Sequence, residues 1–125
     1  MSQITIRRIY HELKPSETNQ VRILVDRLWP RGVKKEEANI DYWFKEVAPS
    51  HELRKWFGHR TERFETFRIK YLEELQTDAT KRKIVQKIAQ IAKKDKVVLL
   101  YGAKDEKYNN ATVLLEELER LLKDL

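Results

Sequence analysis

The chain has 125 residues, of which 41% are hydrophobic and 37% are charged, a composition typical of a single folded domain rather than of a disordered chain. It contains no cysteine, which excludes disulfide bonds, thiol chemistry and cysteine-bound metals. The formal net charge of +6 favours acidic partners, such as nucleic acids, nucleotides or other anions.

The chain begins with two predicted strands. Residues 4–10 are rich in β-branched and aromatic types, and residues 21–28 carry an apolar run that is typical of a strand buried on both faces. The connector, residues 11–19, contains proline, serine and asparagine, and we expect a loop without a helix. Such a connector favours antiparallel pairing if the two strands are direct neighbours, but the sequence leaves the direction of the first strand undecided.

Short helical segments are predicted next. Residues 33–38 indicate a helical turn, and residues 40–47 a brief amphipathic helix with Trp43 and Phe44 on one side. Pro49 ends that helix, because the residue before a proline avoids the helical conformation.

Longer helices and one clear strand make up the rest. A helix begins after an N-cap at Ser50 and ends before Gly58, which suits a left-handed C-cap. Further helices are predicted at about residues 61–75, after a cap at Thr77 or Asp78, and at about residues 110–122. Residues 96–101 read as a buried parallel strand, because four consecutive apolar residues lie within them.

This order of elements predicts a single α/β domain, residues 1–125, with a small, mostly parallel sheet flanked by helices. Residues 21–25 and 97–100 are expected to form parallel strands. Ligands collect at the carboxyl ends of parallel strands, where the loops diverge. We therefore expect the two segments that follow these strands, residues 26–32 and 101–110, to form the two walls of one site.

The residue types in these segments suit an anionic ligand. Guanidinium and ammonium groups bind phosphate or carboxylate, and the free N–H groups at the start of the last helix add a partial positive charge. The candidate binding residues are Arg27, Trp29, Arg31, Ser50, Lys104, Tyr108, Asn109 and Asn110. Asp26 and Asp105 are candidate catalytic residues that act as a general base; the alternative is that either one orients an arginine.

Each candidate also has a structural interpretation that the sequence leaves open. A tryptophan such as Trp29 more often packs in the core than stacks on a ligand. Asn109 and Asn110 suit a helix cap, and Asp26 with Arg27 suits a pair of surface charges. A non-catalytic domain that binds a partner protein is therefore a further alternative.

A nucleic-acid-binding module is the alternative from another functional class. The predicted helix after Asp78 carries a basic face, which more often meets only solvent. Its residues are Lys81, Arg82, Lys83, Lys87, Lys93 and Lys94. We expect no metal site and no cofactor, because the histidines lack metal-ligand spacing and the glycine-rich phosphate motifs are absent.

The sequence also suggests where the protein works. No apolar run approaches the roughly 20 residues of a membrane helix, and the N-terminus lacks the pattern of a secretory signal. We therefore expect a cytoplasmic protein with no membrane contact, while the oligomeric state stays open.

Several segments together resemble one known family. They are residues 25–32, 43–45, 48–50, 53–59, 99–105 and 109–111, and they follow the same order in the DUF488 family, above all in its YeaO-like branch of small bacterial proteins. The resemblance implies a small α/β domain in a bacterial cytoplasm, and it supplies no established catalytic residues. Related branches tend to carry cysteine and histidine near the last loop, where this chain has Tyr101, Asn109 and Asn110, so thiol chemistry is not expected here.

Overall fold

The computed structural model of the protein describes residues 3–14 and 19–124, so residues 15–18 of the predicted loop lie outside the described residues. Within these residues, four strands form one sheet in the order β1-β4-β2-β3, and all neighbours are parallel. The strands are β1 (Ile4–Arg8), β2 (Gln20–Leu24), β3 (Tyr42–Trp43) and β4 (Lys96–Tyr101). The predicted α/β fold with a small parallel sheet is therefore confirmed.

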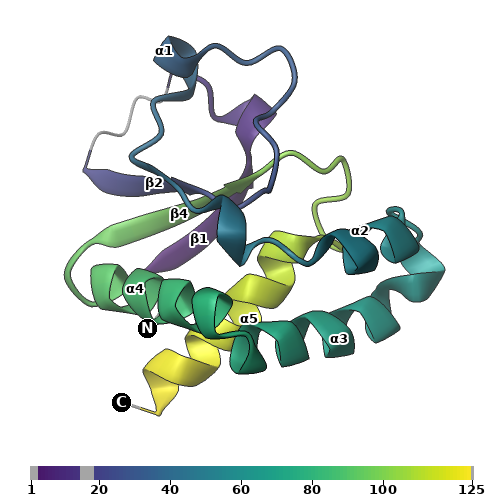
Figure 1. Cartoon of the computed structure of the whole chain (residues 1–125). Coiled ribbons are helices and arrows are strands. Elements are labelled where there is room, and N and C mark those ends of the chain that lie inside the picture. The colour runs from purple at the N-terminus through teal and green to yellow at the C-terminus, as the bar shows by residue number, and fades with distance from the viewer. Residues whose placement is uncertain (1–2, 15–18, 125) are drawn as a thin grey trace.

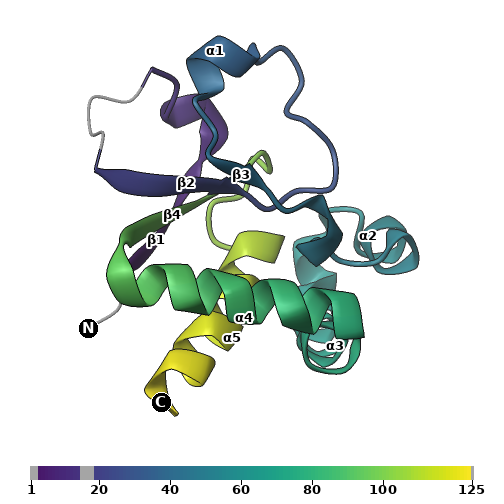
Figure 2. The same ribbon diagram turned by 60° about the vertical axis from the view of Figure 1, so that its left-hand side comes forward.

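The long helices gather on one face of this sheet. The helices are α1 (Lys35–Ala38), α2 (His51–Phe57), α3 (Phe64–Thr77), α4 (Ala79–Lys94) and α5 (Asn110–Lys123), with short 3₁₀ turns η1 (Ile9–His11), η2 (Lys45–Val47) and η3 (Thr61–Arg63). Helices α4 and α5 pack on the sheet, and α3 packs against both of them (Figures 1 and 2). Among the described residues, the opposite face carries α1, the turn η1 and the loops around them.

Alternate residues along the central strands enter two different cores. Val97, Leu99 and Tyr101 of β4 join the main core between the sheet and the long helices, whereas Val98 and Leu100 join a smaller core on the opposite face. This alternation is the period of two that a strand imposes on its side chains. It explains why the residues of β4 after Lys96 are all apolar or aromatic and buried.

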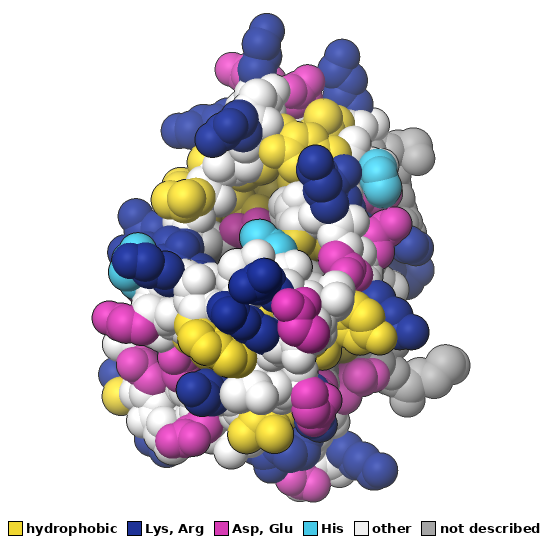
Figure 3. Space-filling model, turned by 90° about the vertical axis from the view of Figure 1, so that its right-hand side faces the viewer, with side chains coloured by type: hydrophobic (Ala, Val, Ile, Leu, Met, Phe, Trp, Pro, Cys, Tyr) yellow, Lys and Arg dark blue, Asp and Glu magenta, His cyan; other side chains and the backbone are white. Residues whose placement is uncertain are grey.

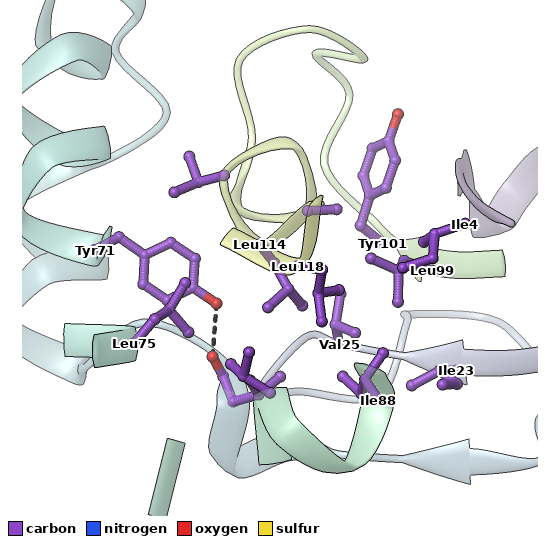
Figure 4. Close-up of a cluster of buried hydrophobic side chains, with 14 of the residues drawn as sticks. Ile4, Ile23, Val25, Tyr71, Leu75, Ile88, Leu99, Tyr101, Leu114 and Leu118 are labelled. Atoms are coloured by element: carbon purple, nitrogen blue, oxygen red, sulfur yellow. Dashed lines mark hydrogen bonds between the residues drawn. The ribbon is translucent and has the colours of Figure 1, made fainter. Parts of the chain in front are cut away.

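One polar contact deep in the main core connects α3 to the turn η2 that follows β3. The hydroxyl of Tyr71, on α3, donates a hydrogen bond to the carbonyl oxygen of Val47 at 2.6 Å, and the side chain of Tyr71 is fully buried (Figure 4). Burial raises the pKa of this hydroxyl well above its ordinary value, so it remains a donor. The bond therefore satisfies two buried polar groups at once.

The position of β1 resolves the question that the sequence left undecided. Antiparallel pairing is favoured only for direct neighbours, and β1 and β2 are not neighbours because β4 lies between them. Ile4 is paired with Val97 and Arg8 with Tyr101, in parallel register. The carboxyl ends of β1, β4 and β2 consequently meet at the same edge of the sheet.

The predicted helix at residues 40–47 is wrong. Asp41 N–H donates to the carbonyl oxygen of Arg22, and Phe44 N–H to that of Leu24, so this segment pairs with β2 as the edge strand β3. Tyr42 and Phe44 stack on one side with ring centroids 5.1 Å apart, while Trp43 points to the other side. Three consecutive aromatic residues suit this alternation, and only a short 3₁₀ turn, Lys45–Val47, follows.

The predicted helix caps are confirmed. The side chain of Ser50 accepts a hydrogen bond from Leu53 N–H, and that of Asp78 accepts one from Lys81 N–H. Gly58 ends α2 with a φ of +52°, which glycine adopts without strain. Among the helices of the described residues, none has both the length and the apolar character that a membrane span requires.

Candidate ligand-binding site

A hollow of about 790 Å³ opens at the carboxyl ends of β1, β4 and β2. Its walls come from the loop after β2, the loop after β4, the segment around α2, and the first residues of α5. Figure 3 looks onto this face, where Lys and Arg side chains surround a recess in which hydrophobic, acidic and histidine side chains are visible. The two loops that the sequence assigned to one site therefore do lie together.

Asp26 joins the two loops at the inner part of the hollow. Its Oδ2 accepts a hydrogen bond from Gly102 N–H at 2.8 Å, and its Oδ1 accepts one from Asn110 Nδ2 at 3.0 Å. A Cβ atom at position 102 would lie only 3.3 Å from Oδ2, so glycine permits this close approach. Both carboxylate oxygens act as acceptors, which is the role of the ionised form.

Opposing effects act on the pKa of Asp26, and burial is the largest of them. Burial raises the pKa of the Asp26 carboxyl group above its ordinary value, because the charged form loses solvation. The bonds from Asn110 and Gly102 act in the opposite direction, as do the nearby side chains of His59 and Arg54. The start of α5 also favours a negative charge, and the Asp26 carboxylate lies beside it because Asn110, the first residue of that helix, donates to it.

The outer rim of the hollow is basic. Arg27, Arg31 and Lys104 all line it, and each is exposed to solvent. Within the described part of the chain, none of their charged groups takes part in an ion pair. Because the rim combines residues from both loops, these cations surround one opening rather than lying on opposite sides of the molecule.

Two further arginines are held in place beside the rim. Arg8 Nε donates to the carbonyl oxygens of Gly102 and Ala103 at 3.3 and 2.9 Å, and its guanidinium lies 4.7 Å from the centre of the Tyr10 ring. Arg54 Nε donates to the carbonyl oxygen of Pro49 at 3.0 Å. Both side chains line the hollow with their positions fixed by backbone groups.

Trp29 forms part of the apolar wall. Its Nε1–H donates to the carbonyl oxygen of Val33 at 2.7 Å, and its ring meets that of Trp43 edge to face at 5.5 Å. Trp43 Nε1–H in turn donates to the backbone carbonyl of Asp26 at 2.8 Å. These contacts fix the shape of the loop after β2, so Trp29 has a packing role and also lines the hollow.

The loop after β4 is shaped by Asp105 and Asn109. Asp105 Oδ1 accepts hydrogen bonds from the N–H groups of Lys107 and Tyr108, both at 2.9 Å, and these bonds lower the pKa of the carboxyl group. The buried side chain of Asn109 caps α5 through Thr112 N–H and donates to the carbonyl oxygen of Asp105. Both residues line the hollow while stabilising its wall.

Two other candidates do not line the hollow. Ser50 Oγ donates to Glu74 Oε2 at 2.6 Å, which links the start of α2 to α3. Tyr108 lies with its ring 4.9 Å from that of Phe64, on the surface beside the loop. The structure therefore places these side chains in packing and capping contacts, apart from the other candidates.

Several lining residues were missed by the sequence reasoning. Arg8 is the last residue of β1 and Tyr10 lies in the turn after it, and the parallel direction of β1 brings both to this edge. Arg54 and His59 belong to the α2 segment, whose packing against the loops no local pattern indicates. Arg8 lies at the carboxyl end of a predicted strand. This position would have indicated a site residue if the strand had been known to be parallel.

Two further predictions concern metal-ligating side chains and the basic face of α4. In the part of the chain that is described, no group of three His, Asp or Glu side chains is placed to hold a metal ion. On the basic face of α4, Lys81 donates to the carbonyl oxygen of Glu46, and Lys87 lies over the rings of Tyr42 and Phe44. Two of the lysines in the nucleic-acid alternative therefore already have partners within the protein.

Comparisons with known proteins identify the family to which the chain belongs. The family described as "Inactive DUF488-N3 subclade" matches residues 3–125. Uncharacterized protein YeaO of Escherichia coli (strain K12) is 44% identical over 118 residues, which cover 94% of this chain and 98% of YeaO. Uncharacterized proteins Mb3100c of Mycobacterium bovis and Rv3073c of Mycobacterium tuberculosis are each 41% identical over 78 residues, or 62% of this chain and 64% of theirs. No solved structure matches significantly. Because the family match and the YeaO match both span nearly the whole chain, the chain belongs to the DUF488 family.

Proposed function

We propose that the protein binds a small molecule with a phosphate or carboxylate group in the hollow at the strand ends, as a binding protein rather than an enzyme. The observation that carries this proposal is the basic rim. Arg27, Arg31 and Lys104 come from two loops far apart in the chain, yet they line one opening and form no ion pair within the described residues. Unpaired cations around a concave site attract and orient an anion.

The hydrogen bonds that the acidic and hydroxyl candidates form within the protein support binding without a chemical reaction. Both oxygens of Asp26 accept hydrogen bonds from the protein, and Asp105 uses one oxygen to hold two backbone N–H groups. Ser50, the hydroxyl candidate, is bonded to Glu74. A general base or nucleophile must take a proton from the substrate or form a bond with it, whereas the hydrogen bonds of these groups hold them in place within the fold, which favours binding over turnover. The word "inactive" in the description of the matching family agrees with this proposal.

The proposal predicts that the double variant Arg27→Ala/Arg31→Ala loses anion binding while it keeps the fold. We expect its affinity for ribose 5-phosphate to fall at least tenfold, because a charge-assisted hydrogen bond contributes roughly 1.5–3 kcal/mol and about 1.4 kcal/mol corresponds to a factor of ten. The measurement is a titration of isotope-labelled protein followed by amide NMR signals. In the wild type, the shifted signals should belong to residues 26–32 and 101–110.

The matched control is Arg82→Ala/Lys94→Ala, which removes the same charge from exposed positions of α4. Its affinity for ribose 5-phosphate should stay within twofold of the wild type. If both double variants weaken binding equally, general attraction by net charge accounts for it, and the hollow is not the site. The proposal also fails if the wild type gives no shifts with phosphates.

A further inference from the structure

The hollow is not uniformly basic, since its inner and outer parts differ in chemistry. Cations stand at the rim, whereas the Asp26 carboxylate lies inside with only part of its acceptor capacity in use. An ionised carboxylate offers about four acceptor positions, and the bonds from Gly102 and Asn110 occupy two of them. A ligand that only carried negative charge would be attracted at the rim and repelled at this inner carboxylate.

Asn110 adds to the acceptor character of the inner part. Its Nδ2 group donates to Asp26 Oδ1 at 3.0 Å and approaches the carbonyl oxygen of Val25 at 3.4 Å, so the donor end of the amide is in use. Its Oδ1 forms no hydrogen bond within the described residues, and Asn110 lines the hollow. The inner part therefore selects a group that donates hydrogen bonds.

The lining of the hollow also includes apolar side chains. Trp29 and Pro30 follow β2, and Pro49 and Phe57 belong to the α2 segment. Rings and prolines offer broad faces that suit a planar aromatic ligand group. The volume of about 790 Å³ lies within the range of roughly 300–1,000 Å³ typical of small-molecule sites.

These three features together describe one class of ligand. It carries N–H donors on one end, a planar ring in the middle and an anion on the other end. We propose that the ligand is a nucleotide whose base lies against Asp26 and Asn110 and whose phosphate lies at the basic rim; this inference rests on the proposed function above. Guanine fits best, because its N1–H and its exocyclic N2 amino group are adjacent donors that match the two oxygens of one carboxylate.

Other anionic ligands match only part of the hollow. Inorganic phosphate satisfies the rim but leaves the acceptors of Asp26 and Asn110 without a partner, which costs binding free energy in a partly buried site. A sugar phosphate can donate to these acceptors from its hydroxyl groups, but it brings no planar ring to the apolar side chains. A dicarboxylate brings its second charge towards Asp26, where the two negative charges repel each other. A base therefore provides partners for the acceptors in the inner part of the hollow, which a phosphate at the rim does not reach.

The test compares ligands that differ by one group. Dissociation constants are measured by calorimetry for GMP, IMP and ribose 5-phosphate, with the wild type and with Asp26→Asn. We expect GMP to bind the wild type at least tenfold more tightly than ribose 5-phosphate. IMP, which lacks only the N2 amino group, should bind about tenfold more weakly than GMP, because a site built to accept from a donor rejects the analogue without it.

The variant then assigns the recognition to Asp26. Replacing one acceptor oxygen by an amide should weaken the binding of GMP and reduce the gap between GMP and ribose 5-phosphate to less than threefold. Circular dichroism and thermal unfolding check that the variant is folded. If it is not folded, the comparison of GMP with IMP on the wild type still decides the question.

The outcomes separate this inference from the proposed function. Equal affinity for GMP and ribose 5-phosphate, equal affinity for GMP and IMP, or a gap that persists in Asp26→Asn overturns the inference about the base, and the anion-binding proposal stands. If none of the phosphates binds the wild type, both proposals fail.

Discussion

Asp26 connects segments that are far apart in the sequence. Its bonds to Gly102 and Asn110 join the loop after β2 to the loop after β4 and to the first turn of α5. Its carboxyl group is at the same time the buried acidic group of the hollow. Because a buried charge costs free energy unless it is compensated, the protonation of this residue affects the stability of the whole fold.

The stability of the protein should therefore depend on pH through Asp26. Burial raises the pKa of Asp26 in the folded state, so the folded state holds this proton more tightly than the unfolded state does. The stabilisation is present below the ordinary pKa of an aspartate and is lost as the pH rises through the raised value. We expect the free energy of unfolding of the wild type, relative to that of Asp26→Asn, to fall between pH 4 and pH 7.

Urea unfolding of both proteins across this range measures the difference. The other titrating groups contribute alike to both proteins, so the subtraction isolates Asp26. A difference that stays constant, or that grows as the pH rises, contradicts the direction of the pKa shift. It would mean that the bonds from Gly102 and Asn110, together with His59 and Arg54, outweigh burial.

At the level of the elements, patterns among neighbouring residues correctly predicted the helix caps and the central strand. Ser50, Gly58 and Asp78 cap helices as the sequence indicated, because a cap depends on a few neighbouring residues. The edge strand at Tyr42–Trp43 was mistaken for a helix, since its pairing with β2 is a long-range interaction. Residues 43, 44 and 47 happen to fit a helical face, and the pairing overrides that pattern.

The same distinction explains which parts of the site the sequence predicted. Residues that directly follow β2 and β4 were assigned to one edge, because the direction of buried strands can be inferred from their apolar runs. Arg8 depends on the direction of β1, and Arg54 and His59 depend on how the α2 segment packs against the loops. Tertiary packing decides these positions, and no local pattern reports it.

Ser50 shows how an element-level role can be separated from a binding role. Its hydroxyl caps α2 and bonds Glu74 on α3. We expect Ser50→Ala to lower the free energy of unfolding by about 1–2 kcal/mol, as the loss of a cap and of a partly buried hydrogen bond does. The affinity for ribose 5-phosphate should remain within twofold, because Ser50 does not line the hollow.

Chemical denaturation and the NMR titration provide the two measurements for Ser50. Ser50→Thr is the matched control, because it keeps a hydroxyl that can cap the helix and should recover most of the stability. A Ser50→Ala variant with unchanged stability but much weaker binding would show that this hydroxyl contacts the ligand. The role of Ser50 as a substrate-binding residue would then be supported instead.

For the molecule as a whole, a polyanion can be attracted by the net charge or bound at one basic surface. The net charge of +6 attracts any polyanion over a long range, and this attraction weakens steeply as salt rises. The basic face of α4 belongs to the helical layer, whereas the basic rim belongs to the hollow at the strand ends. A nucleic-acid site on α4 therefore predicts that DNA binding depends on the basic residues of α4, whereas attraction by net charge predicts that it depends equally on the residues of the rim.

Two variants with equal charge distinguish these cases. Arg27→Ala/Arg31→Ala and Arg82→Ala/Lys94→Ala each lower the formal net charge by two, from +6 to +4. We expect both to weaken association with a short DNA duplex to a similar extent at 50 mM salt, with little association left for any of the proteins at 200 mM, since binding through phosphate neutralisation alone is steeply salt-dependent. Fluorescence anisotropy of labelled duplex measures this association. If instead Arg82→Ala/Lys94→Ala alone abolishes DNA binding, and the wild type still binds the duplex at 200 mM salt, then α4 is a nucleic-acid site and the charge of the molecule acts locally there.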